Sequence, residues 1–309
     1  MSAAPQCVRS KLAVVAAVLL AGALSAAQQK PAAPQNAAAQ QAPAINPQEL
    51  VRRAARNEIK ADDVHQYFMY RDRVEYRNHS ITKEVMETPQ GGLSRTLAID
   101  DRPLTPEQRA KEDQKLEKFA NNPETRREQK QASQEEDQRE RLMLTSLPDA
   151  FLYTYAGTES GPNGDQLVHL TFKPNPGFNP PNHETRVYQG MQGDMLIDSK
   201  AMRVAKIDGT LFQDVDFGWG ILGRLYKGGK FYVEQRDVGG RWETVQETLD
   251  FHGKILMIKP LNIYSKETAT DFQPVPANLT VAQALEMLRK GDQTVAQNGN
   301  ATKEGNSHK

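Results

Sequence analysis

The chain has 309 residues, and its 39 Lys and Arg balance 39 Asp and Glu, so the formal net charge is zero at pH 7. A balanced charge gives no reason to expect nucleic acid or an anionic membrane surface as the partner. The single cysteine, Cys7, precedes an apolar run that we predict to be cleaved off, which excludes a disulfide, a thiol nucleophile and a thiolate metal site from the mature chain.

The N-terminus has the pattern of a secretory signal. A basic start precedes an apolar run over residues 12–24, and small residues follow up to Ala27. The run is shorter than the roughly 20 residues that span a bilayer. We therefore predict a signal peptide over residues 1–27, cleaved near Ala27, and a soluble periplasmic protein whose mature chain has no transmembrane segment.

Two low-complexity segments flank the remaining chain. Residues 28–45 are rich in Ala, Gln and Pro and contain no aromatic residue, and residues 293–309 are polar. Such compositions bury too little apolar surface to offset the entropy of ordering, so both segments are predicted to be disordered. Residues 46–292 are long enough for one domain with its own core, which we favour over two small domains.

Capping residues mark four helix starts, at Asn46, Thr105, Asn122 and Thr280. Proline follows the first three, and Gln stands three residues after each threonine, as in a capping box. The first helix carries one apolar stripe and is predicted to lie against a sheet face. The stripe consists of Leu50, Val51, Ala54, Ala55 and Ile59. The last helix has a similar face, made by Val281, Ala284, Leu285 and Leu288.

Between the first two helices, apolar and polar residues alternate with period two. Alternation from Phe68 to Tyr76 predicts a long strand with one buried face. Residues 80–86 and 93–99 predict two more strands, and the Pro-Gln-Gly-Gly sequence at 89–92 predicts the turn that joins them. Three consecutive antiparallel strands are the simplest arrangement.

A charged segment over residues 105–144 then interrupts the strands. Its Glu, Arg, Lys and Gln favour helix, but apolar residues are sparse, so we predict a solvated helical hairpin with a packed base. The charges are mixed in sign, which favours solvated helical faces over a docking arm for a partner.

Strands are predicted again at residues 150–155 and 166–173, before a proline-rich segment at 174–181 that suits neither helix nor strand. The segment has Phe178 at its centre. It is either a loop with one packed aromatic residue, which we favour, or a mobile lid beside a pocket.

Residues 190–272 contain short alternating runs that are broken by glycines, a pattern typical of an antiparallel meander. Turns are predicted at the glycine-bearing pairs 208–209, 228–229, 239–240 and 252–253. The core of this region is predicted to contain Trp242, Val245, Leu249, Phe251, Leu256 and Ile258. Helices at both ends and in the middle of an antiparallel sheet make the fold class α+β.

One glycine motif matches a nucleotide-binding fingerprint, but the sequence after it does not predict the helix that such a site requires. Gly218, Gly220 and Gly223 match the G-x-G-x-x-G fingerprint of dinucleotide-binding folds. The last glycine of a true fingerprint opens a helix, whereas Arg224 leads within a few residues into another predicted strand. We therefore predict a glycine bend or bulge, with Trp219 packed or half exposed.

The other candidate residues do not form a catalytic set. No two histidines have the short helical spacing of zinc ligands, and Asp214 and Asp216, although they share a strand face, are explained as outward-facing positions. There is no G-x-S-x-G and no P-loop. The prediction is no catalytic residue, no cofactor site, no metal site and no enzyme. The histidines are His65, His79, His169, His183, His252 and His308.

The order of elements over residues 67–272, with the sequence GDMLIDSKAMRVAKIDGTL at 193–211, resembles the LolA/LolB-like superfamily of outer-membrane lipoprotein-sorting proteins. The glycine-rich segment 217–229, the strand 231–238 and Trp242 after a turn belong to the same pattern. The resemblance implies an unclosed antiparallel half-barrel, covered by helices, whose concave apolar face holds acyl chains. The charged insert at 105–144 departs from the compact carriers.

Three functional hypotheses follow. The favoured one is a periplasmic, non-enzymatic carrier or chaperone for lipid or lipidated protein, since acyl chains bind at ~0.8 kcal/mol per buried CH₂ without a polar motif. The alternative is an envelope-stress sensor or interaction module that contacts an envelope protein through the insert at 105–144. An undetected hydrolase is the least favoured. Alternation does not tell which sheet face is concave, so the residues that line a cavity are not predicted.

Overall fold

The computed structural model describes residues 46–61, 66–162, 164–218, 220–256 and 258–290. The predicted signal peptide, the leader at 28–45 and the tail at 293–309 lie outside the described residues, as do His65, Trp219 and His308. Within the described ranges, every helix is too short or too polar to cross a bilayer.

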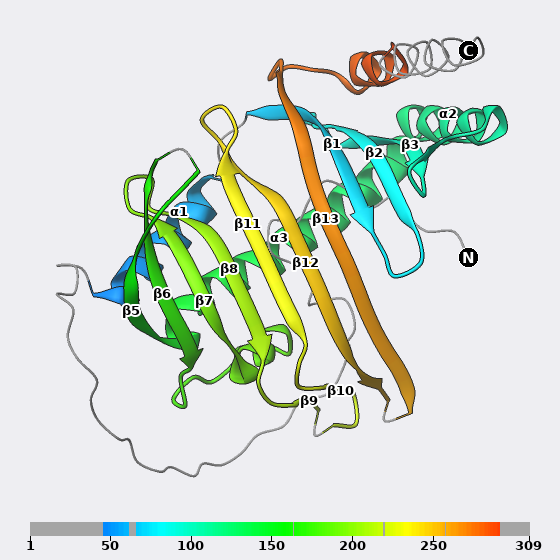
Figure 1. Ribbon diagram of the computed structural model, residues 1–309. Helices are drawn as coiled ribbons and strands as arrows, with labels where there is room; N and C mark the ends of the chain where they lie inside the picture. The colour runs from blue at the N-terminus through cyan, green and yellow to red at the C-terminus, as the bar shows by residue number, and fades with distance from the viewer. Residues whose placement is uncertain (1–45, 62–65, 163, 219, 257, 291–309) are drawn as a thin grey trace, which may run out of the picture.

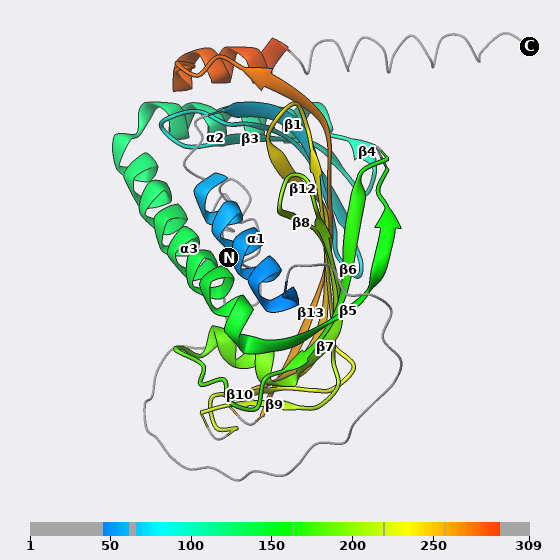
Figure 2. The same cartoon turned by 90° about the vertical axis from the view of Figure 1, so that its left-hand side faces the viewer.

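The fold is built on one antiparallel sheet of thirteen strands (Figure 1). Its order is β4-β3-β2-β1-β13-β12-β11-β8-β7-β6-β5, and β9 and β10 attach to one end of β12. The sheet curves without closing, which confirms the predicted α+β class and the half-barrel (Figure 2). The strands are β1 Tyr67–Glu75, β2 Ser80–Met86, β3 Leu93–Ile99, β4 Arg102–Pro103, β5 Phe151–Ser160, β6 Gln166–Pro174, β7 Met191–Asp198, β8 Arg203–Leu211, β9 Val215–Phe217, β10 Gly223–Leu225, β11 Lys230–Asp237, β12 Trp242–Ile255 and β13 Lys259–Val275.

Helices cover the concave side of the sheet. Figure 2 shows α1 between the long helix α3 and the sheet, while α2 and the helix over residues 281–290 lie at the end near β1 to β3. A short 3₁₀ helix, η2, precedes β7. The bounds are α1 Pro47–Ala61, α2 Pro106–Asn121, α3 Pro123–Ala150 and η2 Glu184–Gly190.

The four predicted helix starts are confirmed by their hydrogen bonds. The side chain of Asn46 accepts from Gln48 N at 2.9 Å, and that of Asn122 accepts from the amides of residues 124 and 125. Thr105 forms a complete capping box with Gln108, and Thr280 forms one with Gln283. These bonds satisfy amides that a helix end leaves without intrahelical partners.

The apolar stripe of α1 packs into the main core, as predicted. Leu50, Val51, Ala54 and Ala55 are buried, and Ile59 is half-buried beside them. A buried ion pair fixes the other end of the helix, where Arg203 of β8 donates to Glu58 at 2.8 and 2.6 Å. The amide of residue 204 donates to the same carboxylate at 2.9 Å. The two oxygens of Glu58 therefore accept three hydrogen bonds, as a buried carboxylate requires.

The predicted insert is longer and better packed than its composition suggests. α3 continues past Leu144 to Ala150, with Pro148 inside its last turn, and Met143, Leu144, Leu147 and Ala150 of its end belong to the main core. The predicted strand at 150–155 consequently starts at Phe151. In the proline-rich loop, Phe178 packs against the main core, which agrees with the favoured reading of one packed aromatic residue.

Two of the four predicted turns are wrong. Residues 228–229 and 239–240 do form turns, but 208–209 lie inside β8 and 252–253 lie inside β12. Gly209 and Gly253 allow a neighbouring strand or side chain to approach closely, and the chain does not reverse at either residue. A Cβ on Gly253 would stand 2.1 Å from the carbonyl oxygen of Arg224 in the neighbouring strand. The residue is glycine because β10 passes directly over it.

The predicted core of the meander is correct in part. Leu249 and Phe251 are buried and Trp242 and Val245 are half-buried, but Leu256 and Ile258 are 61% and 88% exposed. Leu256 and Ile258 belong to the turn that joins β12 to β13, which replaces the turn predicted at 252–253. The longer hairpin carries them beyond the core.

Candidate apolar cleft

An apolar cleft lies between α3, η2 and the concave face of the sheet. It encloses about 30 Å³, which is room for one or two water molecules and too little for an acyl chain. The hydroxyl of one tyrosine is the only polar side-chain group among its lining residues. These are Met143, Leu144, Leu147, Phe151, Phe172, Val187, Tyr188, Met191, Met195, Ile207 and Phe231.

The floor of the cleft follows from strand alternation and register. Met195 of β7 pairs with Ile207 of β8, so both side chains point to the concave face. One row further along, Phe172 and Phe231 are separated by two glycines, through the pairs Phe172–Gly193, Gly193–Gly209 and Gly209–Phe231. The side chain of Met191 packs over Gly209 between the two phenyl rings, since a Cβ on Gly209 would stand 3.0 Å from its Sδ and 3.6 Å from Cζ of Phe172.

The roof is the C-terminal part of α3. Met143, Leu144 and Leu147 recur at helical spacing and face the sheet. Pro148 has no amide hydrogen, so it cannot donate to the carbonyl of Leu144, four residues earlier. The helix is therefore weakened by one backbone bond in the turn that covers the cleft.

Two tyrosines hold the roof to the structure below it. The hydroxyl of Tyr188 in η2 donates to the Met143 carbonyl at 3.3 Å, and that of Tyr153 in β5 donates to the Leu147 carbonyl at 2.9 Å. Burial raises the pKa of Tyr153 well above its ordinary value, and burial also raises the pKa of Tyr188. Both hydroxyls therefore remain protonated donors at physiological pH.

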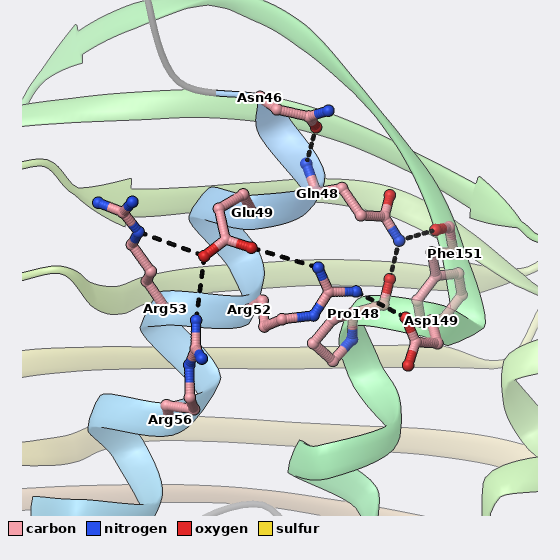
Figure 3. A network of polar contacts seen from close by, with 9 residues as sticks. All are labelled: Asn46, Gln48, Glu49, Arg52, Arg53, Arg56, Pro148, Asp149 and Phe151. Carbon is pink, nitrogen blue, oxygen red and sulfur yellow. Dashed lines mark hydrogen bonds and ion pairs between the residues drawn. The ribbon is translucent and has the colours of Figure 1, made fainter.

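A polar network ties the end of α3 to α1. In Figure 3, Gln48 and Arg52 of α1 point toward the junction between α3 and β5. Gln48 donates to the carbonyl of Pro148 and, at 3.3 Å, to that of Phe151, which lines the cleft. Arg52 donates to Asp149 at 2.8 Å. The end of α3 next to the cleft is therefore anchored by directional bonds.

Glu49 lies at the centre of the same network. It accepts hydrogen bonds from Arg52 at 3.3 Å, Arg53 at 3.4 Å and Arg56 at 3.0 Å (Figure 3). The bond from Arg52 is the main cause that lowers the pKa of this carboxyl. All four side chains are well exposed, so solvent weakens each pair.

A buried cluster of charged side chains lies at the turn between β11 and β12. Arg241 donates to Glu87 at 3.0 Å and also contacts Glu243, and each of these side chains is no more than 10% exposed. Glu87 also accepts from the amide of Phe68 at 2.9 Å. Burial raises the pKa of Glu87, and the charge of Arg241 opposes that rise. The arginine bridges both carboxylates, so the three side chains form a structural cluster.

The residues singled out by sequence do not gather at the cleft. Asp214 and Asp216 both face Arg224, at 3.8 and 2.5 Å, and are about 40% exposed. Gly218 and Gly220 have φ of 55° and 79° in the turn between β9 and β10, so the predicted glycine bend is confirmed. The last glycine of the motif, Gly223, begins β10 and not a helix.

The described histidines are also dispersed. His79 stacks on Tyr76, His169 contacts Glu159 and Asp194 on strands β5 and β7, and His252 contacts Arg77. His183 precedes η2. Within the described residues, His, Cys, Asp and Glu form no group of three or more that could hold a metal ion.

Comparisons with known proteins add little. No family model matches the sequence, and no curated protein matches it. A crystal structure of a DUF1329 family protein from Desulfovibrio piger is similar over 77% of this chain and 97% of that chain, with 11% identity and a TM-score of 0.30. An identity and a TM-score this low carry no functional inference, so the function has to be derived from the cleft itself.

Proposed function

We propose that the protein is a non-enzymatic carrier that binds the acyl chain of a lipid or of a lipidated protein in the cleft beneath α3. The observation that carries the proposal is the lining, in which the side chains are apolar apart from one tyrosine hydroxyl. Such a surface binds by burial of hydrocarbon and needs no polar recognition motif. The secretory pattern at residues 1–27 supports a site of action outside the cytoplasm.

The cleft has to expand when it binds a chain, because about 30 Å³ does not accommodate one. Two features of the cleft support expansion by movement of α3. Methionines at 143, 191 and 195 have flexible side chains that repack easily. Pro148 removes a backbone bond from the roof. Ten buried CH₂ groups contribute about 8 kcal/mol, which offsets the loss of several roof contacts.

Mass spectrometry of organic extracts from the purified protein tests the proposal. We expect lipids or fatty acids in stoichiometric amount, removed by delipidation and restored when the protein is incubated with the same lipid. A protein that carries no lipid after purification and takes up none after incubation would refute the carrier function.

The alternative, an interaction module that contacts an envelope protein, is favoured by one observation. Before residue 140, the only residue that the two helices of the insert bury is Leu116, so both helices expose most of their charged surface. Deletion of residues 105–144 does not test this alternative, because it also removes Met143 and Leu144 from the core. Charge reversal at Lys111, Lys118 and Lys130 leaves the cleft intact. Loss of a partner in pull-down experiments, with lipid content unchanged, would favour the module over the carrier.

A further inference from the structure

Exposed apolar side chains gather at one end of the sheet, where β9 and β10 and the turn between β12 and β13 lie (Figure 1). Of the eight large apolar side chains that are exposed in the described part of the chain, five belong to this end. The most exposed are Ile258 at 88%, Leu256 at 61% and Ile221 at 58%. The other two are Phe212 and Tyr226.

Backbone hydrogen bonds hold these residues together as one surface, which we call the apolar tip. Leu256 N donates to the carbonyl of Leu222 at 3.1 Å, which joins the turn between β12 and β13 to the turn between β9 and β10. Tyr226 N donates to the carbonyl of His252 at 2.8 Å. The tip is therefore a defined platform, and Ile221, Leu256 and Ile258 extend into solvent from these two adjacent turns.

The tip is surrounded by lysines. Residues 212–230 and 252–260 contain five Lys or Arg and only two Asp, both of which face Arg224. No ion pair is found in the described chain for any of the four lysines, which are Lys227, Lys230, Lys254 and Lys259. The zero net charge of the whole chain conceals this local excess of positive charge.

The spacing of apolar and basic residues matches the layers of a membrane surface. Lys254 stands two residues before Leu256, and Lys259 directly follows Ile258. At about 3.3 Å per strand residue, Lys254 lies roughly 7 Å behind the apolar turn. Amphipathic segments insert to about 5–10 Å at the boundary between headgroups and acyl chains. With Leu256 and Ile258 at that depth, Lys254 lies at the level of the lipid phosphates.

We infer that the apolar tip docks on a bilayer that contains anionic phospholipid. The tip lies at the same end of the molecule as the cleft, since Phe212 N donates at 3.0 Å to the carbonyl of Gly190, between the cleft-lining residues Tyr188 and Met191. Docking goes beyond the carrier function and does not require an occupied cleft.

Vesicle flotation with the full mature chain tests the inference. We expect binding to vesicles of phosphatidylethanolamine and phosphatidylglycerol, weaker binding to pure phosphatidylcholine, and loss of binding at high salt. The double variant Leu256→Ser, Ile258→Ser is expected to lose affinity by at least about ten-fold. The double variant Lys254→Gln, Lys259→Gln is expected to lose roughly five-fold per lysine on anionic vesicles only.

Matched substitutions at the opposite end serve as controls. Met287→Ser removes an exposed apolar side chain from the helix over residues 281–290, and Lys118→Gln with Lys130→Gln removes two exposed lysines from α2 and α3. We expect these variants to bind vesicles like the wild type. Equal binding by the tip variants and the controls, or no binding to either kind of vesicle, would overturn the inference. A dimer that only the tip variants dissociate, without vesicle binding, would assign the surface to a second copy of the chain and also overturn it.

Discussion

Two parts of the sheet differ in the side chains that one row of its concave face contains. One row of register partners crosses both parts, and in β6, β7, β8 and β11 it consists of buried apolar residues. In β12 and β13 the same row continues with buried Glu247 and half-buried Glu267, before it returns to apolar Val74 in β1. The apolar part of the row is Leu170, Met195, Ile207 and Val233. We call the two parts the apolar half and the charged half.

This contrast separates an adaptable region from a fixed one. Apolar side chains pack without directional bonds, so hydrocarbon from a ligand can replace their contacts. The ion cluster of Arg241, Glu87 and Glu243 depends on partners at fixed positions, and loss of one partner leaves a buried charge. We therefore expect the apolar half to respond to ligand and the charged half to act as a scaffold.

The largest effect is expected in the charged half. Arg241→Ala removes the partner of Glu87 and Glu243 and should lower the free energy of unfolding by about 3–5 kcal/mol, measured by urea denaturation. The triple variant Arg241→Met, Glu87→Gln, Glu243→Gln removes all three charges and should recover most of that loss. If the triple variant is as unstable as Arg241→Ala, the cost does not come from unpaired charge.

A slightly smaller effect is expected in the apolar half, with a different signature. Met195→Ala enlarges the cleft and should cost about 2–5 kcal/mol without ligand. Added fatty acid should narrow the gap in thermal midpoint between this variant and the wild type, because the enlarged cleft needs less expansion to bind the chain and the folded state therefore gains more from the ligand. The same ligand should leave the deficit of Arg241→Ala unchanged. If fatty acid narrows the gap in thermal midpoint equally for both variants, the apolar half and the charged half do not differ in their response to ligand.

The roof of the cleft is expected to contribute less. Tyr188→Phe removes the hydroxyl that donates to the Met143 carbonyl and should cost about 1 kcal/mol. The variant should also increase hydrogen exchange of the α3 amides near Met143, measured by mass spectrometry. Tyr155→Phe is the matched control, since this tyrosine also packs against the main core but its hydroxyl contacts the side chain of Thr158 and not a carbonyl of α3. Equal exchange in both variants would show that Tyr188 does not hold the roof.

The smallest effect concerns pH and the network of Figure 3. The bond from Arg52 lowers the pKa of Glu49 from its ordinary 4.5, so ionised Glu49 stabilises the folded state above that value. This contribution is lost as the pH falls through the lowered pKa. Glu49→Gln should therefore have a lower thermal midpoint than the wild type at neutral pH, and the difference should disappear in acid. A difference that persists in acid would contradict the assignment.

The sequence predicted helices and strands well where the residues that start or end them lie within a few positions of one another. β2 and β3 have the predicted bounds, because the turn between them is marked by proline and glycine. The glycines at 209 and 253 misled the turn assignment, since their role is contact with neighbouring strands and side chains. Sequence alternation does not encode such contacts. Leu256 and Ile258 were misplaced for the same reason.

The cleft itself could not be predicted. Alternation shows which side chains share a face of β7 and β8, but the concave face is set by the curvature of the whole sheet and by α3, which returns from a distant part of the chain. The charged composition of residues 105–144 concealed the apolar end of α3. The two glycines between Phe172 and Phe231 permit close packing of Met191 and of neighbouring backbone, which becomes apparent only once the strand register is known.

The central claim is that the cleft beneath α3 holds an acyl chain, and titration with a fluorescent fatty acid tests it most directly. Met195→Trp fills the cleft with an indole ring, at a tolerable packing cost of about 1–3 kcal/mol, and Met287→Trp is the exposed control. We predict saturable binding to the wild type and to Met287→Trp, and at least ~10-fold weaker binding to folded Met195→Trp. Equal binding to all three proteins, or none to the wild type, would contradict the claim.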